Sequence, residues 1–462
     1  MIGMGYVGIP TAALLADVPG FNVVGVQRRS RRSGWKIDHL NAGKSPIEGD
    51  EPGLGELIER VVRKGSFRVT DDTSVCADAD AILIAVQTPV NANHVPQYSS
   101  LEEVSRTLGQ HMKRGAMIII ESTVAPGTTQ YFVQPILEEL SGFRAGEDFN
   151  LVFSYERVMV GRLLHNLRNM PKVVGGLTPE CTERAVLFYS NFVKAEILPT
   201  DCLTAEVSKV TENAYRDVNI AFANEVALIC ESLGVNVYDV RSLVNSLPHD
   251  PSDPGKNPYR MMHIPGAGVG GHCLPKDTWL LKYAVDAYGR KKVVTKVLEG
   301  SRFANDYMPM HMKELIEDAL DERNMRLDEA RVCILGFAFL EDSDDTRNTP
   351  SLTLYNILKP LCREVRVHDP YVDAYENVEL TSDLDEAVKG SDCLAVVTRH
   401  REYLDLRLDW LKKLLATPVI VDGRNVFNPE DAVSSGFSFR GVGIGTTTGQ
   451  SKKERSTLSR EA

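Results

Sequence analysis

Residues 266–277 (GAGVGGHCLPKD) place a thiol, Cys273, among groups that could activate it. Four glycines in the six positions 266–271 allow a tight backbone that approaches a ligand closely. His272 precedes the cysteine, and Lys276 and Asp277 follow it; nearby positive charge stabilises the thiolate, which is the reactive form. The pattern indicates a nucleophilic cysteine, whereas the alternative is a glycine-rich turn that holds a buried structural cysteine.

A long helix is expected over residues 203–233, which contain neither proline nor glycine. At 100° per residue, Lys209 and Asn213 fall on one face, four residues apart, and can aim at one small target. The alternative is an ordinary solvated face. The neighbouring face is apolar and contains Val207, Val210, Ala214, Val218 and Ala221.

The N-terminal residues carry the pattern G-x-G-x-x-G at Gly3, Gly5 and Gly8, running into a helix. Such glycines bring a pyrophosphate close to a helix N-terminus, and a strand-like segment at 21–26 supplies the expected βαβ context. The pattern predicts a dinucleotide site that includes Tyr6 and Val7. Because two residues precede Gly3, we expect either a misplaced reading-frame start or a truncated first strand.

Gln27, Arg28 and Arg29 stand where an acidic ribose ligand is usual. An arginine there is typical of sites for a 2′-phosphate, so the residues leave NADP open beside NAD. Arg28 is the predicted cofactor contact. The alternative is that both arginines belong to a solvated loop.

Polar residues follow three apolar runs that are expected to be buried parallel strands. The run at 81–86 leads to Thr88, the run at 117–120 leads to Thr123, and the run beginning at residue 150 leads to Glu156. Ligands of open α/β sheets lie at such strand ends, so these three residues are predicted site residues. The alternative for each threonine is a turn former or helix cap.

A second α/β unit is expected after a helical region at 278–320. Its strands are predicted near residues 331–336, 365–369, 393–397 and 419–422, and it lacks G-x-G-x-x-G. The predicted fold is therefore α/β, with two Rossmann-like doubly wound parallel-sheet domains joined by a helical linker domain. The expected boundaries are 1–200 for the nucleotide-binding domain, 201–320 for the helical domain, 321–445 for the second Rossmann-like domain and 446–462 for a disordered tail.

Composition narrows the class of protein. The net charge of -11 argues against nucleic acid as a partner. The eight cysteines are scattered without a C-x-x-C pair, which predicts reduced thiols, no bound metal and a cytoplasmic location. No apolar run approaches the roughly 20 residues of a membrane span, and no signal peptide is visible.

Together these segments resemble the UDP-glucose/GDP-mannose dehydrogenase family over nearly the whole chain. The resemblance implies an NAD-binding Rossmann domain, a helical linker that forms a homodimer or higher homo-oligomer, and a C-terminal domain that binds the UDP of a UDP-sugar. Six motifs carry it, in order: GMGYVGIP at 3–10, ESTVAPGTT at 121–129, ERV at 156–158, EVSKVTENAYR at 206–216, GVGGHCLPKD at 268–277 and DDTR at 344–347.

The chemistry of such an enzyme agrees with these residues. Oxidation of a primary alcohol gives an aldehyde, and a thiolate at Cys273 would convert it to a thiohemiacetal that a second NAD oxidises to a thioester. Lys209 and Asn213 can stabilise the alkoxide. By resemblance, Glu156 is the general acid/base, Asp277 helps to hold Lys209 and the water, and Thr123 contacts that water or the nicotinamide region.

The resemblance also implies substrate contacts. Arg347 is expected to contact UDP, Lys276 to contact the substrate or balance charge, and Arg260 to reach the sugar site of the partner subunit. Leu340 departs from the family, which often has lysine there. The full expected set of substrate-binding residues is Glu156, Arg157, Lys209, Asn213, Arg216, Arg260, Gly270, His272, Lys276 and Arg347.

The Gly-Gly-His-Cys sequence ending at Cys273 is similar to the branch of the family that acts on 2-acetamido sugars. The expected reaction is oxidation of C6 of a UDP-N-acetylhexosamine, and UDP-N-acetyl-mannosamine is the first-choice substrate. UDP-N-acetyl-glucosamine and UDP-glucose are the alternative substrates. An alternative of another class is an inactive nucleotide-sugar binding protein.

Overall fold

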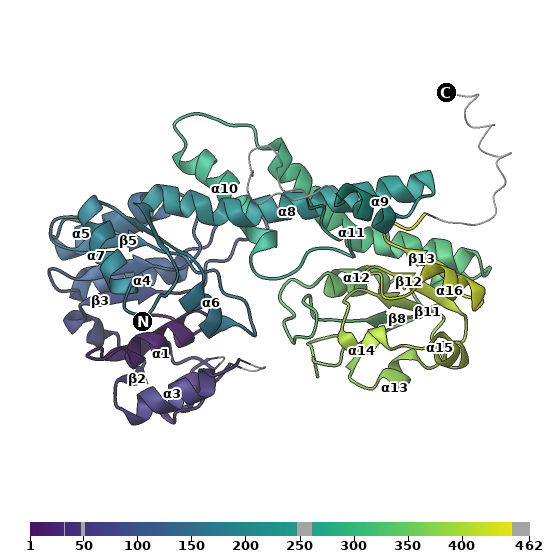
Figure 1. The fold of residues 1–462 in the computed structure, drawn as a ribbon, viewed down its shortest axis with the longest axis horizontal. Helices are drawn as coiled ribbons and strands as arrows, with labels where there is room; N and C mark the ends of the chain where they lie inside the picture. Colours follow the sequence, from purple (N-terminus) through teal and green to yellow (C-terminus); the bar gives the residue numbers. More distant parts are fainter. Residues whose placement is uncertain (32, 48–50, 247–260, 446–462) are drawn as a thin grey trace. The chain divides into compact units, whose positions relative to one another are not determined.

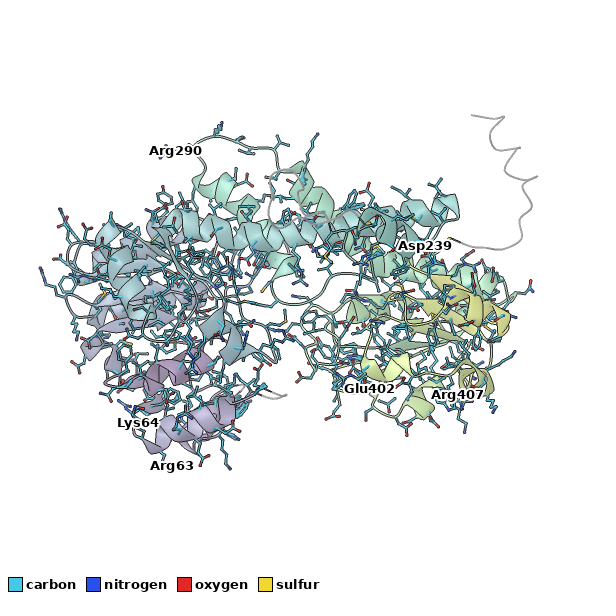
Figure 2. The ribbon with its side chains drawn as sticks, in the orientation of Figure 1. Arg63, Lys64, Asp239, Arg290, Glu402 and Arg407 are labelled. Carbon is cyan, nitrogen blue, oxygen red and sulfur yellow. The ribbon has the colours of Figure 1, made fainter. Side chains whose placement is uncertain are left out.

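The computed structural model describes residues 1–31, 33–47, 51–246 and 261–445 (Figure 1). The chain divides into two compact units. The first unit comprises Met1–Ala214 and Lys276–Val294, and the second comprises Tyr215–Pro275 and Thr295–Ala462. Each unit has its own sheet and its own apolar cores. Charged side chains such as Arg63 and Glu402 are exposed (Figure 2).

The sheet of the first unit forms around short apolar strands. β4 consists of Met117–Ile120, and all four of its residues are buried, as is usual for a parallel strand covered on both faces. The five-stranded part has the order β3-β4-β5-β6-β7, and only the β5–β6 pair is antiparallel. The other members are β3 (Ala81–Ile84), β5 (Asn150–Phe153), β6 (Lys172–Gly176) and β7 (Ile197–Asp201).

Ile2 takes the place of the first strand. It forms parallel bridges to Ile84 and to Val26, the last residue of β1 (Val23–Val26). Its N–H donates to Leu83 O at 2.8 Å, and its carbonyl accepts from Ala85 N at 2.8 Å. β1 pairs on its other side with β2 (Phe67–Thr70). The short first strand expected from the sequence is thus a single bridging residue between the two parts of the sheet.

Helices connect these strands. The first helix after β1 is α2, which ends at Asn41. The remaining elements follow the βα alternation closely. They are α1 (Gly8–Asp17), α2 (Trp35–Asn41), α3 (Leu54–Arg63), η1 (Thr73–Asp78), α4 (Ser99–His111), η2 (Thr129–Val133), α5 (Gln134–Ser141), α6 (Leu163–Asn169) and α7 (Pro179–Tyr189).

The predicted long helix is α8 (Cys202–Leu233). The helical region predicted at 278–320 is two helices, α10 (Leu274–Tyr288) and α11 (Lys296–Asp321), and α9 (Val237–Val244) follows α8. None of the helices among the described residues is long and apolar enough to cross a membrane.

The sheet of the second unit contains six parallel strands in the order β10-β9-β8-β11-β12-β13. The order reverses between β8 (Arg331–Leu335) and β11 (Cys393–Val396), which is the doubly wound arrangement expected from the sequence. The other strands are β9 (Glu364–His368), β10 (Leu380–Thr381), β12 (Val419–Asp422) and β13 (Ser438–Gly441). The helices are η3 (Leu327–Glu329), α12 (Pro350–Leu358), α13 (Leu384–Val388), α14 (Arg401–Leu404), α15 (Leu408–Leu414) and α16 (Pro429–Ser434).

Candidate active site

The G-x-G-x-x-G turn leads into the N-terminus of α1, which has no side-chain cap. A Cβ at Gly8 would lie 1.9 Å from Gly3 O, and one at Gly3 would lie 2.4 Å from Ala85 O, so both glycines are required by the fold. A Cβ at Gly5 would meet nothing within 4 Å. The space beside Gly5 and the exposed Tyr6 is therefore open, and the uncapped helix end fits a dinucleotide pyrophosphate.

Both arginines that follow β1, Arg28 and Arg29, form ion pairs with acidic side chains. Arg28 pairs with Glu103, and Arg29 pairs with Asp71 at 3.0 Å. Gln27 turns inward instead, and its Oε1 accepts a hydrogen bond from Met4 N at 3.2 Å. The position of the usual ribose-binding acid thus holds a neutral amide.

Two of the predicted threonines meet at the ends of β3 and β4. Thr88 Oγ1 donates to the carbonyl oxygen of Thr123 at 2.6 Å. Ser122 Oγ donates to Val86 O at 2.7 Å, which ties the same two strand ends a second time. These contacts bring the ends of β3 and β4 together, and the roles of Thr88 and Thr123 in the site stay predictions.

Glu206 fixes the 121–129 segment to α8. Its carboxylate accepts from Gly127 N at 2.5 Å, from Thr129 N at 2.9 Å and from Thr129 Oγ1 at 2.6 Å. Burial raises the pKa of Glu206 to about 7. The sequence analysis did not predict these long-range contacts of Glu206 with Gly127 and Thr129.

Lys209 and Asn213 contact residues from two other segments. Lys209 is buried, and its Nζ donates to the carbonyl oxygen of Glu156 at 3.2 Å. Asn213 Nδ2 donates to Asp277 Oδ2 at 2.5 Å, and Lys276 Nζ lies 2.8 Å from Asp277 Oδ1. The solvated-face alternative for this side of α8 is wrong, because the face lies against Glu156 and the first turn of α10.

A buried cluster that the sequence did not predict lies behind Glu156. Lys172 Nζ forms an ion pair with the Glu156 carboxylate and lies 3.7 Å from Glu121 Oε1. The Tyr189 hydroxyl donates to the same Glu121 oxygen at 2.8 Å, and its ring centroid is 4.4 Å from Lys172 Nζ. Burial raises the pKa of Glu121 to about 7. The charge of Lys172 acts to lower this pKa, and the charge of Glu156 acts to raise it. One cation therefore serves two buried carboxyl groups.

In the second unit, the glycine-rich loop packs on residues 339–348. A Cβ at Gly270 would lie 2.4 Å from Phe339 Cβ, and Gly271 has a φ of +90°, so both positions require glycine. Gly271 N donates to Arg347 O at 2.8 Å, and Asn348 Nδ2 donates to Gly271 O at 3.0 Å. Cys273 is exposed and immediately precedes α10. The alternative of a buried structural cysteine is wrong.

The predicted arginine contacts differ in their surroundings. Arg157 is held internally by Glu212 at 3.0 Å, by Tyr155 OH at 3.0 Å and by Pro171 O at 2.7 Å. Arg216 is exposed, and the Arg347 guanidinium bonds Asp345, with Nε to Oδ1 at 2.8 Å. His272 and Leu340 are half-buried. Arg260 lies outside the described residues.

The three domains of one family match the chain in order. The UDP-glucose/GDP-mannose dehydrogenase family matches with its NAD binding domain over residues 1–193, its central domain over 203–307 and its UDP binding domain over 333–429. The domain boundaries inferred from the sequence remain predictions.

Full-length relatives agree with this assignment. A UDP-N-acetyl-D-mannosamine dehydrogenase of Pyrococcus horikoshii is 36% identical over 446 residues, covering 96% of this chain and 99% of the relative. A crystal structure of an NDP-N-acetyl-D-galactosaminuronic acid dehydrogenase from Methanosarcina mazei is 44% identical, with a TM-score of 0.87 and coverage of 96% and 94%. The structure of a UDP-D-ManNAc dehydrogenase from Pyrococcus horikoshii gives 36% identity and a TM-score of 0.85, with coverage of 96% and 98%. The chain therefore belongs to the UDP-glucose/GDP-mannose dehydrogenase family and is an NAD-dependent nucleotide-sugar dehydrogenase.

Proposed function

We propose that this enzyme oxidises the C6 hydroxyl of a UDP-N-acetylhexosamine, UDP-N-acetyl-mannosamine above others, to the uronic acid. The observation that carries the proposal is the assembly of Lys209, Asn213, Glu156 and Asp277 from three separate segments. Cys273 precedes Asp277 by four residues and is exposed, as a nucleophile requires. Several relatives that match most of the chain are named for UDP-N-acetyl-D-mannosamine.

The first oxidation requires that the C6 hydroxyl lose a proton and a hydride. The Lys209 ammonium and the Asn213 amide supply the groups that stabilise the alkoxide. The hydrogen bond to Glu156 O positions the ammonium, and the bond to Asp277 fixes the orientation of the amide. NAD, held at the glycine turn that leads into α1, would supply the hydride acceptor.

The second oxidation needs a covalent adduct, because a free aldehyde carries no further hydroxyl to oxidise. The Cys273 thiolate adds to the aldehyde carbon to give a thiohemiacetal. Loss of its hydroxyl proton and of a second hydride, for which a second NAD would be the acceptor, then gives a thioester. Water then attacks the thioester while Glu156 accepts its proton, and the thiolate leaves as the acid is released. Lys172 keeps the Glu156 carboxylate paired in its buried setting.

The surroundings of Arg28 and Arg29 favour NAD over NADP. A 2′-phosphate would have to compete with Glu103 and Asp71 for the two guanidinium groups. NAD has no such phosphate and leaves both ion pairs intact.

A homodimer, as the minimum assembly, is proposed from an exposed apolar stripe in the second unit. Tyr215, Phe222 and Ile229 lie seven residues apart along α8 and are 69%, 60% and 49% exposed. The face named from the sequence is largely buried within the chain, because Val210, Ala214 and Ala221 all lie in its core. Exposed apolar stripes of this kind mark protein interfaces. Light scattering of Phe222→Asp should show a smaller particle than the parent protein, with Glu225→Gln as the exposed control on the same helix. An unchanged mass would contradict this interface.

We also propose a cytoplasmic location, which the scattered cysteines support. An inactive binding protein is disfavoured, because a site that only binds sugar needs no exposed thiol such as Cys273.

A substrate panel tests the proposed function. The kcat/KM for UDP-N-acetyl-mannosamine with NAD should exceed those for UDP-N-acetyl-galactosamine, UDP-N-acetyl-glucosamine and UDP-glucose, and NADP should support less turnover. The galacto-configured sugar is the second candidate, because the 44% identical structure bears the name of an N-acetyl-galactosaminuronic acid enzyme. Preference for UDP-glucose would overturn the assignment to 2-acetamido sugars, and preference for another N-acetylhexosamine would overturn only the epimer.

A further inference from the structure

Residues 339–348 of the second unit hold the backbone of the Cys273 loop, so whatever holds this segment also acts on that loop. The segment contributes both hydrogen bonds to Gly271, through Arg347 O and Asn348 Nδ2, and the Phe339 ring on which Gly270 packs. Gly271 lies two residues before the proposed nucleophile. The other end of the segment is anchored separately, at Asp342.

The anchor is the fully buried ring of His400. The backbone N–H of Asp342 donates to His400 Nδ1 at 3.0 Å. Asp342 has a φ of +53°, and its carboxylate accepts from Arg401 N at 2.9 Å, so the chain turns sharply at this contact. Within residues 339–348, Phe339 N donates to Asp345 O at 3.0 Å, which carries the anchored geometry toward Arg347.

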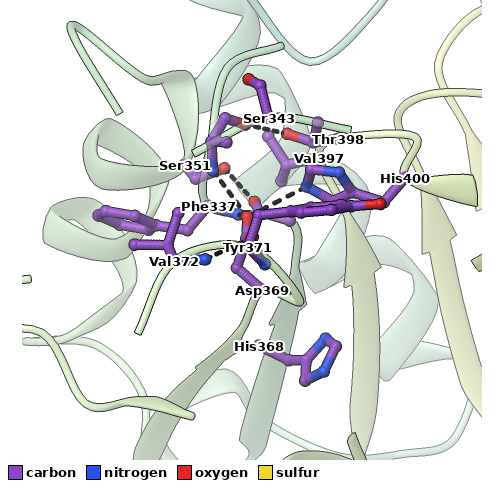
Figure 3. A network of polar contacts seen from close by, with 12 residues as sticks. Phe337, Ser343, Ser351, His368, Asp369, Tyr371, Val372, Val397, Thr398 and His400 are labelled. Carbon is purple, nitrogen blue, oxygen red and sulfur yellow. Dashed lines mark hydrogen bonds and ion pairs between the residues drawn. The ribbon is translucent and has the colours of Figure 1, made fainter. Parts of the chain in front are cut away.

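The other nitrogen of His400 is held by Asp369, beside Tyr371 and at the end of β9 (Figure 3). His400 Nε2 lies 3.1 Å from Asp369 Oδ2. That carboxylate also accepts backbone N–H bonds from Phe337, Ala338, Tyr371 and Val372, at 2.6, 2.8, 2.8 and 3.2 Å. The Asp369 carboxylate acts only as an acceptor in all of these contacts, so Nε2 of His400 must donate its hydrogen bond to Asp369.

These two contacts fix the protonation state of His400. Nδ1 accepts a hydrogen bond and so carries no proton, while Nε2 donates and so carries one. A second proton at Nδ1 would point at the N–H of Asp342 and break that bond. The ionisable groups on the elements around the ring are Asp342, Asp369, His368, Tyr371, Tyr403 and Arg401.

We propose that His400 is a positioning residue for the proposed nucleophile: its ring anchors residues 339–348, which hold the Cys273 loop. The proposal rests on the proposed function for the identity of the nucleophile. The hydrogen bonds at Nδ1 and at Nε2 of His400 can be removed one at a time.

Two matched variants separate the contacts. In His400→Asn, the side-chain oxygen can replace Nδ1 and still accept from Asp342 N. In His400→Gln, the longer amide can reach Asp369 in place of Nε2, and the bond to Asp342 is lost. Asp342→Gly is the control, because it keeps the N–H donor at a positive φ that glycine adopts readily.

The first measurement is kcat/KM of the intact protein at neutral pH. His400→Gln should lose about tenfold in kcat/KM, the effect of one lost hydrogen bond, whereas His400→Asn and Asp342→Gly should stay within about threefold of the parent. Equal losses in the Asn and Gln variants would overturn the proposal.

The second measurement does not depend on turnover. Hydrogen exchange of peptides covering residues 337–349 and 266–273 should be faster in His400→Gln than in His400→Asn at one pH, with peptides of the first unit unchanged. Exchange that follows this pattern in a protein inactive on every sugar would leave the anchor standing and refute the proposed function alone. Identical exchange in the two variants would refute the anchor.

Discussion

Glu121 should make the first unit less stable as the pH rises from 4.5 to about 7, and replacing Glu121 with glutamine should remove most of this loss. Glu121 is fully buried beside Lys172, which it shares with Glu156, and burial raises its pKa from 4.5 to about 7. Below the lower value, the folded and unfolded states both carry the proton, and Glu121 has no effect on the pH dependence. As the pH rises toward the upper value, the unfolded chain releases its proton first, so stability falls.

The magnitude follows from the difference between the two pKa values. About 2.5 units at 1.36 kcal/mol each correspond to a loss of about 3 kcal/mol above pH 7, with the sharing of Lys172 by two carboxyl groups making this an upper limit. Glutamine keeps the size and an oxygen that can accept from Tyr189 OH, and it cannot ionise. Lys172 then pairs with Glu156 alone.

Guanidinium unfolding near pH 5 and near pH 8 measures the effect. The quantity compared is the free energy of unfolding of Glu121→Gln minus that of the parent protein. This difference should be about 2–3 kcal/mol larger near pH 8 than near pH 5. Glu206 titrates in the same range but is present in both proteins, so it cancels. Glu102→Gln, which alters an exposed ion pair with Arg106, is the control and should change the difference by less than about 0.5 kcal/mol. A Glu121→Gln difference as small as that control would refute the reasoning.

Three further predictions test the site by substitution. Cys273→Ser should still bind UDP-sugar in calorimetry but lose at least about a hundredfold in release of the acid, because an alkoxide is harder to generate and its ester harder to hydrolyse; undiminished turnover would contradict the covalent step. Gly5→Ala should keep its melting temperature and bind NAD at least about tenfold more weakly, whereas Gly8→Ala should be destabilised by about 2 kcal/mol because its Cβ would lie 1.9 Å from Gly3 O; the reverse order of effects would contradict the open space beside Gly5. Lys172→Met should cost about 3 kcal/mol of stability by leaving two buried acids without a cation, and Lys172→Arg should recover part of it; equal losses in both would show that packing, and not charge, matters.

Local sequence patterns were enough for much of the fold and part of the site. The apolar run at 117–120 and the absence of proline and glycine from 203–233 predicted β4 and α8, because both depend on neighbours in the sequence. The four-residue spacing of Lys209 and Asn213 placed them on one face for the same reason. β10 and β13 were missed, since β10 has two residues and β13 contains Ser438 and Arg440 in place of an apolar run.

The remaining parts of the site depend on contacts between distant residues. Lys172 begins a strand that is otherwise apolar, and a lysine at a strand end is usually solvated; only the approach of Glu156 and Glu121 makes it a buried cation. The hydrogen bonds that Gly127 N and Thr129 N donate to Glu206 likewise join residues 79 and 77 positions apart in the sequence. A lysine at the start of an apolar strand was the one signal in the sequence that could have led to this cluster.

The two sheets share a doubly wound order and use their strand ends in different ways. In the first unit, the turn after Ile2 leaves open space at Gly5, where an added Cβ would meet no atom within 4 Å. In the second unit, Asp369 stands after β9, where a ribose-binding acid is usual, but four backbone N–H groups and His400 already occupy its carboxylate. Although burial opposes ionisation, these hydrogen bonds, led by that from His400, lower the pKa of Asp369. An acid already committed to five donors cannot bind a ribose, so the same sheet order serves a dinucleotide in the first unit and the anchoring of residues 339–348 in the second.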